Sequence, residues 1–240
     1  TQFDQLAELV EVFADGTLRT ANNQNLIVRW IRTGALPHLF ARLQEIGLAE
    51  AGSNTIHDVV SCPGADTCNL AVTSSMSLAK HLTRFLKNPG ASADSVELAR
   101  SADIKISGCP NSCGQHHVAA IGFHGTMRHA GDGRQIPEYQ LHLGGGFNED
   151  GVQFGRHIVK IPAQRAGEAL LALLDLFRDR RDSGEDARSF FRRVAKEDVT
   201  AALGPHTIGM TFENLREQDL VDLGQEKVFD VAIGRGECAA

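Results

Sequence analysis

Four cysteines in two short pairs constrain this chain more than any other feature. Cys62 and Cys68 have five residues between them, Cys109 and Cys113 have three, and forty residues separate the two pairs. Each pair follows an apolar run that indicates a strand, and each lies in a loop that contains Pro and Gly. Four thiolates that converge from two loops are typical of an iron–sulfur or a zinc site. The sequence therefore predicts a metal-binding domain.

The spacing alone does not choose the metal. Structural zinc sites pair cysteines two to four residues apart, so a gap of five residues fits zinc poorly. The single cysteine run of bacterial ferredoxins is also absent. Backbone N–H groups in Gly- and Pro-containing loops can donate hydrogen bonds to cluster sulfurs, which favours ligation over four incidental cysteines.

The composition excludes several classes of function. A net charge of −6 and a pI near 5.9 argue against a nucleic-acid partner. No run of eighteen apolar residues is present, so we expect no membrane span, and the acidic N-terminus does not resemble a secretory signal. The few, unevenly placed cysteines predict a reducing, cytoplasmic location. The first residue is Thr1, which indicates processing or excision from a longer polypeptide.

The hydrophobic pattern divides the chain into three regions and predicts an α+β fold. Residues 1–50 are expected to form a helix, two strands and a helix. Residues 51–203 are mixed. Residues 204–240 form a short acidic tail in which Cys238 is expected to be a free thiol.

Within the middle region the pattern predicts strands, helices and one hairpin. The expected strands are 56–61 and 104–106, and the hairpin pairs 118–123 with 139–143 across a turn at 131–133. The expected helices are 70–87, 163–181 and 187–203. The mixed charges of the last two helices predict a solvated surface, with docking of an acidic electron donor as the alternative.

The histidines give a weaker signal than the cysteines. His116 and His117 follow the second cysteine pair, and we expect them to pack or to hydrogen-bond locally. The remaining histidines near the hairpin are expected on its exposed face: His124, His129, His142 and His157.

Two segments together resemble a known signature. SCPGADTCNLAVTSS at 61–75 and ISGCPNSCGQHHVAAIGF at 106–123 are similar to the paired cysteine motifs of sirohaem-containing sulfite and nitrite reductases. The upstream stretch LRTANNQNL at 18–26 resembles an element of the ferredoxin-like half-domain of that family, with Ala21 where the family often has Thr. The resemblance covers residues 5 to 203.

The resemblance implies a fold, two cofactors and a set of ligands. It implies a ferredoxin-like half-domain followed by a mixed α/β domain with a 4Fe–4S cluster and a sirohaem. The cluster ligands would be Cys62, Cys68, Cys109 and Cys113. Cys113 would also be the axial thiolate of the sirohaem iron. Residues implied to contact the macrocycle or its carboxylates are Asn111, Arg19, Gln24 and Asn25.

The implied reaction is six-electron reduction of sulfite to sulfide, with nitrite reduction to ammonia as the alternative. Electrons would come from ferredoxin or a flavoprotein. The family normally has two copies of this architecture, and only the second bears the cysteines. We therefore expect this chain to act with an N-terminal half or a second subunit that supplies cationic anion-binding residues. A non-catalytic iron–sulfur or zinc-binding electron-relay module is the alternative from another class.

Overall fold

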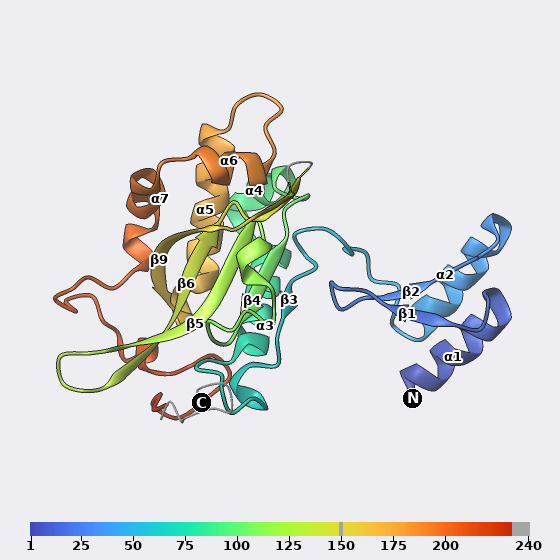
Figure 1. Ribbon diagram of the computed structural model, residues 1–240, viewed down its shortest axis with the longest axis horizontal. Helices are drawn as coiled ribbons and strands as arrows, with labels where there is room; N and C mark the ends of the chain where they lie inside the picture. The colour runs from blue at the N-terminus through green and yellow to red at the C-terminus, as the bar shows by residue number, and fades with distance from the viewer. Residues whose placement is uncertain (149–150, 232–240) are drawn as a thin grey trace. The chain divides into compact units, whose positions relative to one another are not determined.

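The structure is a computed structural model that describes residues 1–148 and 151–231. The chain divides into two compact units, Thr1–Ser53 and Asn54–Ala240 (Figure 1). Among the described residues, no helix is both long enough and apolar enough to span a bilayer.

The first unit has the predicted order of helix, strand, strand and helix. Its elements are α1 (Gln2–Phe13), β1 (Leu18–Thr20), β2 (Leu26–Val28), the 3-10 turn η1 (Thr33–Ala35) and α2 (Leu36–Glu45). The backbone N–H of Asp4 bonds the Thr1 side chain, and the Asp4 carboxylate bonds the Thr1 backbone. This capping box fixes where α1 begins. β1 and β2 form an antiparallel hairpin, and the buried side chains come mainly from α1.

The second unit is built on a five-stranded sheet with the order β3-β4-β5-β6-β9. The strands are β3 (Val60–Ser61), β4 (Ile104–Ser107), β5 (Ile121–His129), β6 (Gln135–Leu143) and β9 (Arg156–Pro162). β3, β4 and β5 are parallel, whereas β6 pairs antiparallel with both β5 and β9. The short hairpin β7 (Gly146–Asn148) and β8 (Gly151–Gln153) stands apart from this sheet. The predicted hairpin is confirmed, with Ile121 opposite Leu143.

Helices cover one face of this sheet and enclose the main core (Figure 1). They are α3 (Ser75–Lys87), α4 (Ala93–Leu98), α5 (Ala166–Arg180), α6 (Ala187–Arg193) and α7 (Lys196–Leu203). Alternate strand residues point into the core because side chains alternate between the two faces of a sheet. Phe123 of β5 and Leu141 of β6 are buried there in the same apolar cluster as Leu173 and Phe177 of α5. Gly122, His124 and His142 belong to the opposite face.

The expected single helix at 187–203 is wrong, because the structure divides it into α6 and α7. Val194 and Ala195 have extended backbone between the two helices. The guanidinium of Arg156 on β9 donates 2.8 Å hydrogen bonds to the carbonyls of Phe191 and Val194. These bonds satisfy carbonyls that the end of α6 leaves without helical partners. The break lets both α6 and α7 bury apolar side chains in one core.

The expected helix at 70–87 begins later, at Ser75. The backbone N–H groups of Val72 and Thr73 both donate to the carbonyl of Gly108, at 2.8 and 3.1 Å. These hydrogen bonds hold Val72 and Thr73 against a neighbouring loop, so the two residues are not part of the helix. The expected strand at 56–61 is likewise reduced to Val60–Ser61.

The described part of the segment 204–240 packs against the second unit. The short turns η6 (Gly204–His206) and η7 (Glu217–Leu220) belong to it. Arg165 pairs with Asp219 through two hydrogen bonds, and the side chains are 3% and 0% exposed. Asp222 accepts a 2.8 Å hydrogen bond from the backbone N–H of Ser74. The segment is thus held to the start of α3. Cys238 lies outside the described residues.

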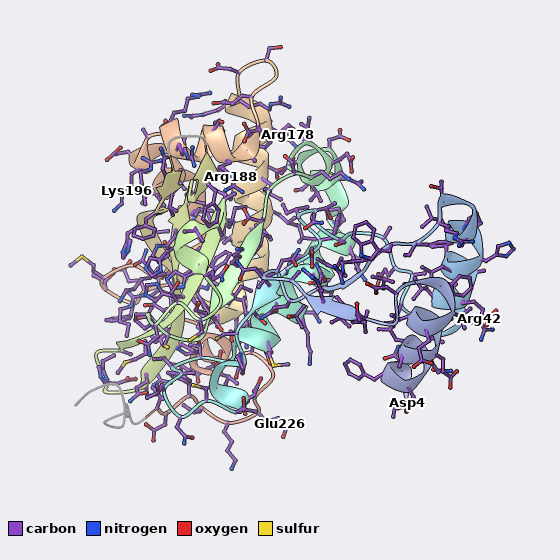
Figure 2. The ribbon with its side chains drawn as sticks, turned by 45° about the vertical axis from the view of Figure 1, so that its right-hand side comes forward. Asp4, Arg42, Arg178, Arg188, Lys196 and Glu226 are labelled. Atoms are coloured by element: carbon purple, nitrogen blue, oxygen red, sulfur yellow. The ribbon has the colours of Figure 1, made fainter. Side chains whose placement is uncertain are left out.

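The charges of the C-terminal helices pair with one another at the surface. Arg178, Arg188 and Lys196 lie on α5, α6 and α7 (Figure 2). The ion pairs of α5 to α7 and the loop that follows α5 are Arg178–Asp175, Arg178–Asp179, Arg180–Asp198, Arg193–Asp182 and Arg193–Glu185. Most of these side chains remain partly exposed, in agreement with the expected solvated surface.

Candidate metal centre

The two cysteine pairs lie where two neighbouring parallel strands end. Cys62 directly follows β3, and Cys109 comes two residues after β4. The backbone N–H of Cys62 donates a 3.1 Å hydrogen bond to the carbonyl of Ile106, which continues the ladder between the strands. Because parallel strands present their carboxyl ends at one edge, this topology brings both cysteine loops together.

Two glycines let the loops approach closely. A Cβ at Gly108 would lie 3.0 Å from the Cα of Gly64 and 2.8 Å from the carbonyl oxygen of Thr73. Gly64 itself has φ of +67°, and a Cβ there would lie 2.5 Å from the backbone nitrogen of Ser75. Both positions are therefore restricted to glycine by contact with backbone, and Gly64 also by a conformation that other residues avoid.

The sulfur of Cys62 is held by donors from both loops. The backbone N–H of Gly108 donates to Sγ of Cys62 at 3.2 Å. The hydroxyl of Ser75, at the start of α3, lies 3.3 Å from the same sulfur and donates to the Cys62 carbonyl at 2.7 Å. A thiolate at this position would gain the Gly108 N–H and the positive end of the α3 dipole, and the Ser75 hydroxyl could turn its one hydrogen from the carbonyl to the sulfur.

The four thiols range from buried to exposed. Cys62 and Cys109 are buried, Cys68 is intermediate and Cys113 is exposed. Burial raises the pKa of Cys109, a hydrogen bond from the Asn111 backbone opposes this rise, and the charges of Cys62, Cys113 and Cys68 raise it further. All four sulfurs therefore lie within electrostatic reach of one another. Two thiols are inside the protein, and Cys113 faces outward.

The spacing of these sulfurs suits a cluster better than a single ion. Around tetrahedral zinc, neighbouring sulfurs are about 3.8 Å apart, given Zn–S bonds of about 2.3 Å. In the part of the chain that the structure describes, no three cysteine sulfurs lie within 4.8 Å of one another. Four thiols from two adjoining loops, with the backbone N–H of Gly108 directed at one sulfur, are consistent with a 4Fe–4S cluster.

The loop between Cys109 and Cys113 has a constrained backbone. Ser112 and Gln115 have positive φ values of 60° and 62°, which are uncommon for residues with a side chain. The hydroxyl of Ser112 bonds Nδ1 of His117 at 2.7 Å. Asn111 is exposed in the same loop as Cys113. The fold thus presents one thiol and one amide together on an open surface, where a large planar cofactor can approach.

The other predicted macrocycle contacts belong to the first unit. Arg19 is exposed on β1, whereas Gln24 and Asn25 lie in the turn before β2. Gln24 has a φ of +65°, and its backbone N–H donates to the carbonyl of Ala21 at 3.0 Å. Their assignment to a macrocycle stays a prediction.

The histidine predictions are confirmed in part and wrong in part. His116 is buried and bonds the Ser107 hydroxyl through Nδ1 at 2.8 Å, as expected of a locally bonded residue. His129 and His157 are exposed. His142 is fully buried and His124 half-buried, however, because the 3-10 turn η4 (His116–Val118) covers this face of the sheet. The alternation of apolar and polar residues in the predicted hairpin does not indicate that η4 covers this face of the sheet.

Sequence reasoning also missed the supports of the cysteine loops. Ser75 contacts Cys62, and Asp222 accepts a hydrogen bond from Ser74, 148 positions away in the sequence. The Gly- and Pro-containing loops were expected to donate backbone N–H groups to sulfur, and the bond from Gly108 to Cys62 agrees with this. Nothing in the local sequence connects Asp222 with Ser74.

Comparison with known proteins agrees with this geometry. The family described as "Nitrite and sulphite reductase 4Fe-4S domain" matches residues 52–195, and "Nitrite/Sulfite reductase ferredoxin-like half domain" matches residues 1–46. This chain belongs to the nitrite and sulphite reductase family. Membership confirms the predicted cofactor class, a 4Fe–4S cluster with sirohaem, and the predicted order of a ferredoxin-like half-domain followed by the cluster domain.

Relatives within the family include enzymes named for either substrate. The chain is 27% identical over 201 residues to "Sulfite reductase [ferredoxin] 1" of Mycolicibacterium paratuberculosis, which covers 83% of this chain and 36% of the relative. It is also 27% identical to "Assimilatory ferredoxin-dependent nitrite reductase" of Haloferax mediterranei, with 84% and 34% covered. The chain thus spans about a third of the length of the curated relatives it matches.

Solved structures agree on the fold. The NirA protein of Mycobacterium tuberculosis is similar with a TM-score of 0.71 and 26% identity, over 82% of this chain and 36% of that chain. Dissimilatory sulfite reductase I is similar with a TM-score of 0.64 over 90% of this chain and 68% of that chain. The second is only 11% identical and therefore supports the fold alone.

Proposed function

We propose that this chain is the cluster-and-haem half of a reductase that converts sulfite to sulfide. The observation that carries the proposal is the convergence of two cysteine loops at the ends of β3 and β4, with Cys113 exposed beside Asn111. A buried metal cluster with one outward ligand is the arrangement that a second, surface-bound metal cofactor requires.

We assign the roles of the residues from the family resemblance, and their positions support the assignment. Cys62, Cys68, Cys109 and Cys113 would hold the cluster, and Cys113 would also be the thiolate available to the sirohaem iron. When bound, these cofactors supply single electrons and an iron with an open face for an anion. Asn111 would contact the macrocycle, and the family resemblance assigns its carboxylates to Arg19, Gln24 and Asn25. The Gly108 N–H and the Ser75 hydroxyl stabilise negative charge on the Cys62 sulfur.

The demand for six electrons explains why one ligand should serve two centres. Reduction of sulfite takes sulfur from +4 to −2, consumes six electrons and eight protons, and yields hydrogen sulfide and three waters. A thiolate that touches both metals removes any gap between the electron store and the iron that binds substrate. Nitrite also requires six electrons, and relatives named for nitrite reduction match this chain as well.

We further propose that the active protein needs a second half. The chain spans about a third of its curated relatives, and an anionic substrate requires cations that the exposed Cys113 loop does not itself provide. An N-terminal half or another subunit would supply the arginines and lysines that bind the anion and protonate its oxygens.

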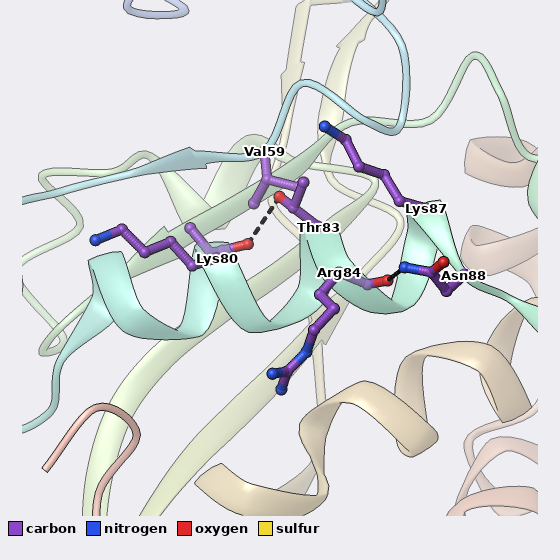
Figure 3. A pocket seen from close by; sticks show the side chains of 7 residues that line it. Val59, Lys80, Thr83, Arg84, Lys87 and Asn88 are labelled. Atoms are coloured by element: carbon purple, nitrogen blue, oxygen red, sulfur yellow. Dashed lines mark hydrogen bonds between the residues drawn. The ribbon is translucent and has the colours of Figure 1, made fainter.

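The electron donor is proposed to dock on the cationic face of α3. Lys80, Arg84 and Lys87 of this helix are exposed and line an open groove with Val59 (Figure 3). α3 begins at Ser75, against the Cys62 sulfur, so the groove lies about 8–18 Å along the helix from the cluster loop. A cationic groove at this distance suits an acidic donor such as ferredoxin or a flavoprotein.

The donor site is tested by reversing one charge. The Lys80→Glu variant should raise the KM for an acidic donor several-fold at low salt, while turnover with a small chemical reductant stays unchanged. Lys196→Glu on α7 is the matched control and should change neither quantity. An equal effect of both variants would remove α3 as the docking face.

The substrate assignment is tested by anaerobic turnover of the chain together with its N-terminal half. We expect sulfide from sulfite with a higher kcat/KM than ammonia from nitrite, and loss of both activities in Cys113→Ser. A preference for nitrite would replace the proposed substrate. If neither anion is reduced and no sirohaem is taken up, the chain is an electron-relay or zinc module.

A further inference from the structure

Three histidines on the sheet face opposite α3 and α5 form a compact, nearly equilateral group. The ring centroids of His116, His124 and His142 are 4.8, 4.8 and 4.9 Å apart. One ring nitrogen of each lies within 4.8 Å of one nitrogen of the other two. In the described part of the chain, no other group of three metal-ligating side chains meets this spacing.

The sheet and η4 hold the three rings in place. His124 on β5 and His142 on β6 are diagonal neighbours, since His124 pairs with Gln140 and His142 pairs with Gly122. A Cβ at Gly122 would lie 2.0 Å from the carbonyl oxygen of His116, so this glycine lets η4 sit directly on the strand. The three side chains therefore come from rigid elements and not from a mobile loop.

The hydrogen bonding of the group is incomplete. Nδ1 of His116 bonds Ser107, and Nδ1 of His124 bonds Nε2 of His142 at 2.7 Å. Nε2 of His116 is buried without a hydrogen-bond partner. A buried polar atom without a partner costs about 1–3 kcal/mol, so a ligand that engages it would stabilise the fold.

The rings are also uncharged at neutral pH. Burial and the neighbouring histidines lower the pKa of His116 to about 2, and the same causes lower the pKa of His142 to about 3. Burial, His157, His117 and Lys160 lower the pKa of His124 to about 4. A neutral imidazole offers a lone pair to a metal without first losing a proton.

We propose that His116, His124 and His142 bind one divalent transition-metal ion of the zinc type, separately from the four cysteines. Three imidazoles around zinc place their nitrogens about 3.3 Å apart, given Zn–N bonds of about 2.0–2.1 Å. The 2.7 Å pair of His124 and His142 would open slightly, and His116 would contribute its unpartnered Nε2. The Ser107 hydroxyl, already on Nδ1, would orient that ring as outer partners of metal-binding histidines do.

Only three protein ligands are present, so the fourth position of a tetrahedral ion would take water or another small ligand. The exposed His157 has its ring 4.3 Å from that of His142 and marks the side from which an ion can enter. This proposal does not depend on the reductase assignment.

Zinc alone, added to the cluster-loaded full chain, is the probe, and X-ray absorption at the zinc edge is the readout. Nitrogen ligands at about 2.0–2.1 Å identify the histidines, whereas sulfur ligands at about 2.3 Å identify the cysteines. We expect one retained zinc with a nitrogen shell. No retained zinc, or a shell of sulfur alone, in the wild-type chain would overturn the proposal. Because nitrogen and sulfur shells are distinguished directly, the histidine site is tested even where the cluster fails to load.

Matched variants provide the second arm. His124→Gln should weaken zinc binding by at least about tenfold, and Ser107→Ala, which removes the outer partner of His116, should weaken it about 10- to 100-fold. His129→Gln, an exposed histidine on the same strand, is the control and should bind zinc as the wild type does. Unchanged binding by a folded His124→Gln chain, with folding checked by circular dichroism, would contradict the assignment.

Discussion

The backbone N–H of Gly108 donates a hydrogen bond to Sγ of Cys62 across 3.2 Å, and so joins the second cysteine loop to the first. The carbonyl of Gly108 simultaneously accepts from Val72 and Thr73. The two peptide groups that flank the Cα of Gly108 therefore hold both ends of the segment that contains Cys62 and Cys68. This relationship explains how two cysteine pairs with forty residues between them form one site.

Gly108→Ala should separate the loops. The added Cβ would lie 2.8 Å from the Thr73 carbonyl oxygen, and the overpacking should destabilise the unit by about 1–3 kcal/mol. We expect a clear loss of bound iron after anaerobic cluster loading. Gly131→Ala is the control, since nothing lies within 4 Å of a Cβ there. Equal iron content in both variants would mean that the loop contact is not required.

Ser75→Ala should make the cluster harder to reduce. The Ser75 hydroxyl donates to the Cys62 carbonyl in the structure and can turn its hydrogen to the sulfur 3.3 Å away once that sulfur is a ligand thiolate. A donor to a ligand sulfur stabilises the more negative, reduced cluster, so its removal lowers the reduction potential. A neutral hydrogen bond worth about 0.5–1.5 kcal/mol corresponds to about 20–60 mV for one electron. Redox titration followed by electron paramagnetic resonance measures the shift, with the exposed Ser101→Ala as control. A potential that stays constant or rises would show that the hydroxyl does not act on the sulfur.

Asp219→Ala should lower the free energy of unfolding far more than a mutation that breaks an exposed ion pair. The mutation leaves the buried Arg165 guanidinium without its carboxylate and should cost about 3–5 kcal/mol of unfolding free energy. Asp198→Ala breaks the exposed pair with Arg180 and should cost about 0–1 kcal/mol. Urea denaturation compares the two. Limited proteolysis should also cut residues 207–223 faster in the first variant, and similar stabilities would refute the structural role of the buried pair.

Asp222 predicts a specific pH dependence. Burial raises the pKa of Asp222 above its ordinary value of 3.8, although hydrogen bonds from Ser74 and Leu223 oppose the rise. The folded state binds this proton more tightly, so the stability it contributes is fully present below pH 3.8 and is lost as the pH rises through the folded pKa. The stability of wild type minus that of Asp222→Asn should fall across this window, by at most about 1.4 kcal/mol per pH unit.

The exposed Asp132 supplies a control of opposite sign. Hydrogen bonds from Arg134 lower the pKa of Asp132, so its contribution is present above pH 3.8 and is lost as the pH falls. Asp132→Asn should therefore have the reverse pH profile. If the two variants titrate in the same direction, the burial of Asp222 against α3 is wrong.

Local periodicity predicted much of the fold. The helix of 1–13, the hairpin that pairs Ile121 with Leu143, and the long helix α5 all follow from apolar spacing and turn residues. The sequence pattern failed where distant groups decide the backbone. Arg156 stabilises the break after Val194, and Gly108 prevents residues 72–73 from joining α3. Such tertiary hydrogen bonds have no periodic signature.

In the candidate site, too, some residues could be predicted from the sequence and others depend on tertiary contacts. The four cysteines could be singled out from the sequence, because thiols in two close pairs are typical of metal sites. The burial of His142 was not evident, because its cover comes from η4 and not from the hairpin itself. Ser75 and Asp222 support the loops through contacts that only the folded chain creates.

The central claim is that Cys62, Cys68, Cys109 and Cys113 hold one 4Fe–4S cluster beside a sirohaem. An anaerobic visible spectrum with iron, sulfide and zinc analysis, made on the chain with its N-terminal half supplied, tests it most directly. We expect about four iron and four sulfide from the cluster, together with macrocycle bands and one further iron. Zinc in place of iron at the cysteines, or a cluster with no macrocycle bands, would contradict the account.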